Sequence, residues 1–101
     1  MLRLAIAQVR PHKGAYAENL RRFGDVFRAA AASAAPPELI VAPETALTGY
    51  FVEGAVRELA LPAERLFADL AAEHEESGAG PVDVALGFYE LHDNRLFNSA
   101  L

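Results

Sequence analysis

A short apolar segment between prolines constrains the fold of this chain more than any other feature. Residues 39–42 (Leu-Ile-Val-Ala) are all apolar, with Pro36 and Pro37 shortly before them and Pro43 directly after them. The segment is too short for a helix, and proline cannot donate a ladder hydrogen bond, so a short strand is predicted. A continuous apolar run is typical of a central strand covered on both faces. The sequence therefore predicts a sheet with helices packed on it.

The residues on either side of this strand predict two helices. Residues 17–35 place Phe23, Phe27 and several alanines at helical spacing, and the prolines that follow end the helix. Residues 62–77 predict a second helix, because proline suits the first helical turn. The expected apolar face of this second helix consists of Leu66, Phe67, Leu70 and Ala71.

Three further segments predict strands. Residues 2–9 alternate large apolar residues with small or polar ones. Residues 82–91 and 96–101 predict two strands of a hairpin, since Asp93 and Asn94 both tolerate the positive φ of a tight turn. The predicted order is strand, helix, strand, helix, strand, strand, which is typical of an α/β fold.

The composition indicates one small globular domain and excludes two classes of partner. The chain has 101 residues, of which 52% are hydrophobic, and its formal net charge is −5. A negative charge argues against a nucleic-acid binder, which needs a basic face for phosphate contacts. No polybasic run suits an anionic membrane, and no apolar run reaches the roughly 18 residues of a membrane span. We find no signal peptide and expect a cytoplasmic protein.

Cysteine is absent, which excludes disulfides, Cys-ligated zinc and a cysteine nucleophile within these residues. The three histidines, His12, His74 and His92, do not have metal-ligand spacing. We therefore expect neither a metal ion nor another cofactor.

The candidate for chemistry is Glu44, which follows the strand at residues 39–42 directly after Pro43. In open α/β sheets, ligands bind beyond the carboxyl ends of the strands. A glutamate held there on a rigid element is well placed to act as a general base. The residues leave an alternative open, in which Glu44 caps a turn or pairs with an arginine.

Four parts of the chain resemble, in order and spacing, the nitrilase or carbon–nitrogen hydrolase superfamily. The most informative is the apolar strand followed by Pro-Glu and then by Leu-Thr-Gly-Tyr. The resemblance implies an αββα sandwich, of which residues 1–101 form an incomplete N-terminal portion of the carbon–nitrogen hydrolase domain. The four parts are residues 4–8 (Leu-Ala-Ile-Ala-Gln), the pair Asn19-Leu20, residues 39–50, and the predicted hairpin with residues 87–90 (Gly-Phe-Tyr-Glu) and 97–100 (Phe-Asn-Ser-Ala).

The resemblance also implies a mechanism that uses a Glu, a Lys and a Cys. Glu44 matches the Glu, which takes the proton of the Cys thiol. The thiolate then attacks the carbon of a small amide, nitrile or N-carbamoyl compound, while the Lys stabilises the developing charge. Lys13 is the only lysine and lies in the loop after the first strand, which is the wrong place. The resemblance therefore implies an N-terminal fragment that is inactive alone, and a full-length protein that forms homo-oligomers.

Three other polar residues in these segments have expected roles. Tyr50 is a candidate substrate-binding residue beside Glu44, and packing beneath the loop is the alternative. For Asn98 we expect a role in fixing the backbone of the hairpin. For Gln8 we expect an inward side chain that hydrogen-bonds to neighbouring main chain.

Two alternative functions remain. The glutaminase domain of glutamine-dependent NAD synthetases starts in a similar way, but residues 51–54 lack the Pro-rich, acidic stretch expected there. A non-catalytic α/β remnant or split subunit is favoured by the missing Lys and Cys and disfavoured by the intact Glu44.

Overall fold

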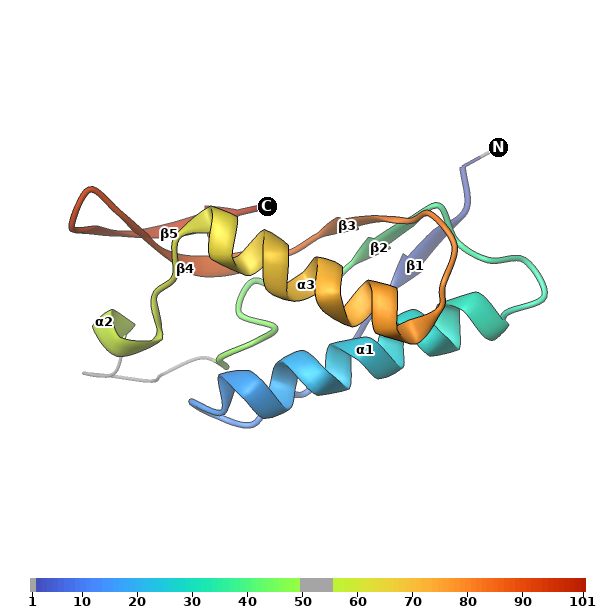
Figure 1. Ribbon diagram of the computed structural model, residues 1–101, viewed down its shortest axis with the longest axis horizontal. Coiled ribbons are helices and arrows are strands. Elements are labelled where there is room, and N and C mark those ends of the chain that lie inside the picture. The colour runs from blue at the N-terminus through green and yellow to red at the C-terminus, as the bar shows by residue number, and fades with distance from the viewer. Residues whose placement is uncertain (1, 50–55) are drawn as a thin grey trace.

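Two helices lie side by side across one face of a small sheet, and a hairpin extends from the end of the sheet (Figure 1). The computed structural model describes residues 2–49 and 56–101. The helices are α1 (Tyr16–Ala32), the short α2 (Val56–Leu59) and α3 (Ala63–Ser77). The strands are β1 (Leu4–Ile6), β2 (Leu39–Val41) and β3 (Asp83–Ala85) in the sheet, and β4 (Gly87–His92) and β5 (Arg95–Ala100) in the hairpin.

β2 is the central strand of a parallel sheet with the order β1-β2-β3. Ile40 at its middle is fully buried against the helical layer, where Phe23, Phe27 and Leu66 belong to the same core cluster. The prediction of a central apolar strand is thus confirmed. Parallel strands need a crossover between them, and α1 and α3 supply one each on the same side of the sheet.

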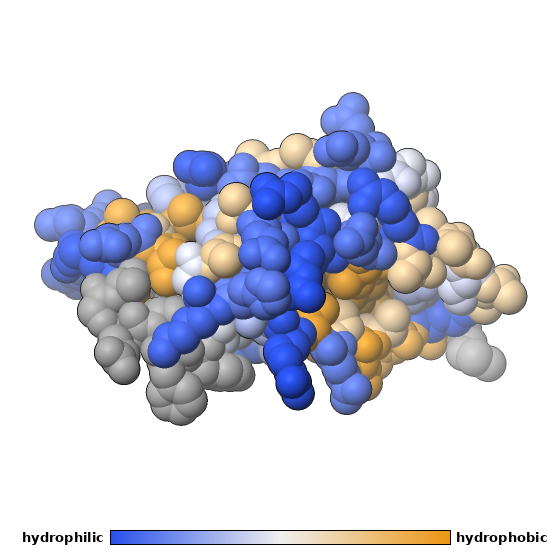
Figure 2. Space-filling view, turned by 90° about the horizontal axis from the view of Figure 1, so that it is seen from below, coloured by the Kyte–Doolittle hydropathy of each residue, from blue (hydrophilic) through white to orange (hydrophobic). Residues whose placement is uncertain are grey.

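The opposite face of the sheet is open, contrary to the expectation that both faces are covered. Leu2, which precedes β1, is 63% exposed, and Leu4 and Ile6 on β1 are 52% and 69% exposed. The two crossover helices lie on one side, so nothing among the described residues covers the other. In Figure 2, apolar side chains gather to the right of the hydrophilic ones, on the side where Figure 1 places β1. An apolar open face is what one half of an αββα sandwich presents to its second sheet.

The predicted strand at residues 82–91 is two strands, β3 and β4, in two different sheets. The Ala42 amide donates to the Ala85 carbonyl oxygen at 2.9 Å, and this bond ends the ladder between β2 and β3. Pro43 follows and has no amide hydrogen with which to continue it. From Leu86 onward the chain pairs with the other arm of the hairpin, where the Leu101 amide donates to the Leu86 carbonyl oxygen at 2.8 Å.

The helix ends differ from the prediction in one case and agree in the other. α1 ends at Ala32, three residues before the predicted end, and Ser33 is already extended. Ala35 precedes Pro36, and a residue in that position is disfavoured in a helix, so the helix ends early. α3 begins after Pro62 and ends at Ser77, as the sequence predicts, and Gly78, whose φ is 72°, caps it.

The apolar face of α3 is narrower than predicted. Leu66 and Leu70 are buried against α1, but Phe67 is 65% exposed and Ala71 is also exposed. Each residue turns a helix by about 100°, so Phe67 points away from the stripe that Leu66 and Leu70 form.

A hydrogen bond from Tyr16 connects the beginning of α1 to α3. Its hydroxyl donates to Asp69 Oδ2 at 2.6 Å, and Arg65 Nε donates to the same oxygen at 3.0 Å. Burial, together with the hydrogen bond to Asp69, holds the pKa of Tyr16 well above its usual range. Tyr16 therefore stays protonated and keeps this bond at any pH near neutrality.

The different burial of two helical phenylalanines predicts very different effects of their removal. Phe27→Ala deletes a ring that is 2% exposed and is expected to lower the free energy of unfolding by about 3–5 kcal/mol. Phe67→Ala deletes a ring that is 65% exposed and should change it by no more than about 0.5 kcal/mol. Urea denaturation followed by circular dichroism measures both. Equal effects would show that α1 and α3 do not pack as described.

Candidate active site

Glu44 lies at the carboxyl end of the central strand, three residues beyond β2. Its side chain is exposed and lines a shallow groove of about 420 Å³ at the point where β2, β3 and β5 meet. Val41, Ala85 and Asn98 are among the other residues that line this groove. The structure therefore places Glu44 where α/β proteins bind their ligands.

The carboxylate of Glu44 accepts a hydrogen bond from the hairpin. Asn98 Nδ2 on β5 donates to Glu44 Oε1 at 2.5 Å, across 54 residues of sequence. The expectation that Asn98 fixes the backbone of its own hairpin is wrong, because its amide reaches the candidate base instead. Among the described residues, none of the ion pairs involves Glu44, so the alternative of a partner arginine is not what the structure shows.

Gly87 at the start of β4 packs against the main chain of Glu44. A Cβ atom at this position would lie 2.8 Å from the Glu44 Cα and would clash with the Glu44 carbonyl oxygen. Only glycine allows so close an approach of two backbones. The hairpin therefore contacts both the main chain of Glu44, through Gly87, and its side chain, through Asn98.

Buried Asn19 holds the turn that follows Glu44. Its Nδ2 donates to the carbonyl oxygens of Leu47 at 2.9 Å and His12 at 2.7 Å, and its Oδ1 accepts from the His12 amide at 2.8 Å. The residue is 3% exposed, and these three bonds use both its donors and one acceptor lone pair. The sequence indicated Asn19 only by resemblance, and the structure shows that it joins the loop after β1 to the turn after Glu44.

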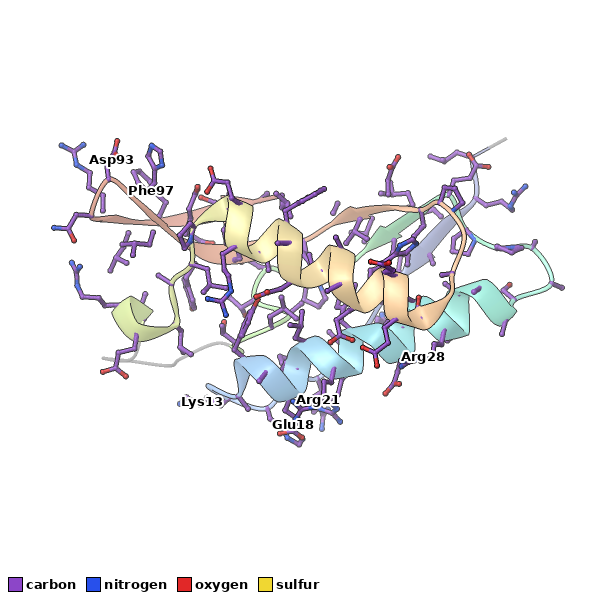
Figure 3. All side chains as sticks on the ribbon, viewed as in Figure 1. Lys13, Glu18, Arg21, Arg28, Asp93 and Phe97 are labelled. Atoms are coloured by element: carbon purple, nitrogen blue, oxygen red, sulfur yellow. The ribbon has the colours of Figure 1, made fainter. Side chains whose placement is uncertain are left out.

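Gly49 closes this turn and packs against the loop that carries Lys13. The Gly49 amide donates to the Thr45 carbonyl oxygen at 2.8 Å, and its φ of 80° is a conformation that favours glycine. A Cβ on Gly49 would lie 3.4 Å from the Lys13 Cα. Figure 3 shows Lys13 at the beginning of α1, with Glu18 and Arg21 nearby. Lys13 is not among the residues that line the groove at Glu44.

Gln8 is not among the residues that line the groove at Glu44. Gln8 is exposed beyond the end of β1, so the expectation of an inward side chain is wrong. Gln8 lies two residues beyond Ile6, the end of β1, and continues its alternation, so it is exposed like Leu4 and Ile6. Tyr50, the candidate substrate-binding residue, lies outside the described residues.

Residues 2–49 and 56–101 contain no group of three or more His, Asp or Glu side chains that could hold a metal ion. In the same part of the chain, no helix has both the length and the apolar character needed to cross a membrane.

Because Gly87 packs against Glu44, we expect a methyl group added at residue 87 to displace the main chain of Glu44. Gly87→Ala is expected to lower the midpoint of thermal unfolding by several degrees, because Cβ must push the Glu44 main chain away. Gly80→Ala is the matched control, since nothing lies within 4 Å of a Cβ there. Differential scanning calorimetry measures both. A Gly87→Ala variant as stable as Gly80→Ala would contradict the described packing.

Comparisons with known proteins show the family and the fold of the chain. The family model described as carbon–nitrogen hydrolase matches residues 3–101. The chain resembles crystal structures of N-terminal amidase, of N-terminal amidase with Gln-Val peptide and of N-terminal amidase with Asn-Glu peptide, each with a TM-score of 0.76 and 25% sequence identity. Each match covers 99% of this chain and 24% of the amidase, so the chain spans about a quarter of its length. No curated protein gives a significant sequence match. On the family match, the chain belongs to the carbon–nitrogen hydrolase family.

Proposed function

We propose that the protein containing this chain hydrolyses a carbon–nitrogen bond of a small amide, with Glu44 as the general base. The observation that carries the proposal is the placement of Glu44 at the carboxyl end of the central strand, facing a groove and held there by the hairpin. A general base needs a fixed position and access to its substrate, and Glu44 has both.

In the proposed reaction, Glu44 takes the proton from a cysteine thiol, and the thiolate attacks the amide carbon. The carbon–nitrogen bond then breaks, and ammonia leaves with the proton that Glu44 took from the thiol. Water hydrolyses the remaining acyl-thioester, which releases the acid and restores the thiol. A lysine stabilises the negative charge that develops on the amide oxygen. Residues 1–101 contain no cysteine, and their only lysine, Lys13, does not line the groove.

We propose that the lysine and the cysteine belong to another part of the protein. The chain spans 24% of the length of the amidase structures that it matches, so most of a domain of that size lies outside it. The open, apolar face of the sheet supports the same view, because a sandwich needs a second sheet there. In this proposal the 101 residues are inactive alone, and they supply Glu44 as one of the three catalytic groups.

Primary amides are the favoured class of substrate, ahead of nitriles and N-carbamoyl compounds. The matched structures are of an N-terminal amidase, and some hold peptides that begin with Gln or Asn. Both of these residues carry a primary amide at the end of the side chain. The glutaminase alternative concerns the same chemical group in free glutamine. Homo-oligomers and a cytoplasmic location remain predictions from the sequence.

Removal of the base is expected to abolish most of the turnover of the complete protein. Glu44→Gln preserves the volume of the side chain but removes the basic oxygen, so kcat should fall about 10²- to 10⁴-fold. Glu64→Gln, at the exposed beginning of α3, makes the same chemical change and should leave kcat unaltered. Release of ammonia from an N-terminal glutaminyl dipeptide is the assay. Wild-type turnover in Glu44→Gln would remove Glu44 from the mechanism.

Residues 1–101 alone are expected to release no ammonia from either a glutaminyl dipeptide or free glutamine. The reason is that these residues lack the nucleophile. The complete protein should release ammonia from the dipeptide, and a preference for free glutamine would favour the glutaminase alternative. Activity in the 101 residues would contradict the division of catalytic groups, and an inactive complete protein would favour the non-catalytic alternative.

A further inference from the structure

We propose that Asn98 is a positioning residue that sets the orientation of the Glu44 carboxylate and leaves its second oxygen to receive the proton. This inference rests on the proposed role of Glu44 as the base. In this proposal Asn98 acts through Glu44 and does not contact the substrate.

The hydrogen bond restrains a side chain that otherwise has many orientations. Glu44 is exposed, and a free glutamate side chain samples several rotamers about three bonds. Asn98 Nδ2 donates to Oε1 at 2.5 Å, which selects the rotamers that bring the carboxylate to β5. No described residue donates a hydrogen bond to Oε2, so Oε1 is the anchored oxygen and Oε2 the free one.

An amide is suited to this task because it donates a hydrogen bond without carrying a charge. An arginine or lysine at the same place would form an ion pair with the carboxylate and would compete with proton transfer to it. Asn98 therefore orients the base and leaves its negative charge available.

The position of Asn98 is itself fixed by the strand register of the hairpin. Asn98 pairs with Tyr89, and Ala100 pairs with Gly87, the residue that packs against the Glu44 main chain. One rigid hairpin therefore holds Glu44 at two points, the backbone and the carboxylate. A shift of the hairpin would move both points together.

Asn98 is not needed to hold the hairpin together. The adjacent Ser99 provides a side-chain bond within the hairpin, since its Oγ donates to Glu90 Oε1 at 2.8 Å. Asn98 is exposed, and the bond to Glu44 is the one that its side chain makes with the described residues. Loss of an exposed hydrogen bond changes stability little.

The test uses two variants of the complete protein: Asn98→Asp keeps the shape of the side chain but replaces the donor with a carboxylate, and Asn98→Ala removes the donor without adding a charge. We expect kcat for a glutaminyl dipeptide to fall about 100-fold, the usual effect of a misplaced catalytic group, with KM changed less than twofold. Asn98→Ala should show a similar loss. Asn94→Asp is the matched control, since it makes the same change at the turn of the same hairpin, where aspartate also tolerates positive φ. Its kcat should stay at the wild-type value.

A double variant separates this inference from the proposed function. If Asn98 acts through Glu44, Asn98→Ala, which can form no new bond to the residue at position 44, should cause no further loss of kcat in a Glu44→Gln protein. Wild-type kcat in Glu44→Gln would overturn the proposed function itself. An inactive Glu44→Gln with a fully active Asn98→Asp would overturn only the role of Asn98. A rise in KM with unchanged kcat, or fully additive losses, would also overturn it.

Discussion

The close approach of Gly87 to the main chain of Glu44 is the contact on which the candidate site depends. Pro43 ends the ladder between β2 and β3, so the two chains separate directly after Ala42 and Ala85. Because residue 87 is glycine, the separated chains still touch two residues further along, at Glu44 and Gly87. This contact brings the whole β4–β5 hairpin, and Asn98 with it, to the end of the central strand.

The buried network on the other side of the turn serves the same purpose. Asn19 and Gly49 connect the turn after Glu44 to the loop after β1, through hydrogen bonds and through close packing against Lys13. Since Asn19 is buried and Glu44 is exposed, rigidity comes from the interior and the reactive group faces outward. A base supported in this way needs little reorganisation when a substrate arrives.

Local patterns predicted the elements well, whereas contacts between distant segments could not be predicted. The central strand at residues 39–42 and the turn at Asp93 and Asn94 follow from apolar content and from tolerance of positive φ, which are local properties. The division of residues 82–91 into two strands depends on Pro43, about 40 residues earlier, and no periodicity reveals that dependence. The contact between Asn98 and Glu44 could not be predicted either. It depends on the strand register of the hairpin and on the packing of Gly87 against Glu44, which joins distant segments. The exposure of Phe67 likewise depends on how α1 crosses α3.

The central claim is that Glu44 is one of three catalytic groups and that the other two come from another part of the protein. A crystal structure of the complete protein would test it most directly, through the distance between the Glu44 carboxylate and the nearest cysteine sulfur. We expect a cysteine Sγ within about 4 Å of Oε2, close enough for proton transfer to Glu44, with Asn98 still bonded to Oε1. A groove closed over Glu44 with no cysteine near it would contradict the account.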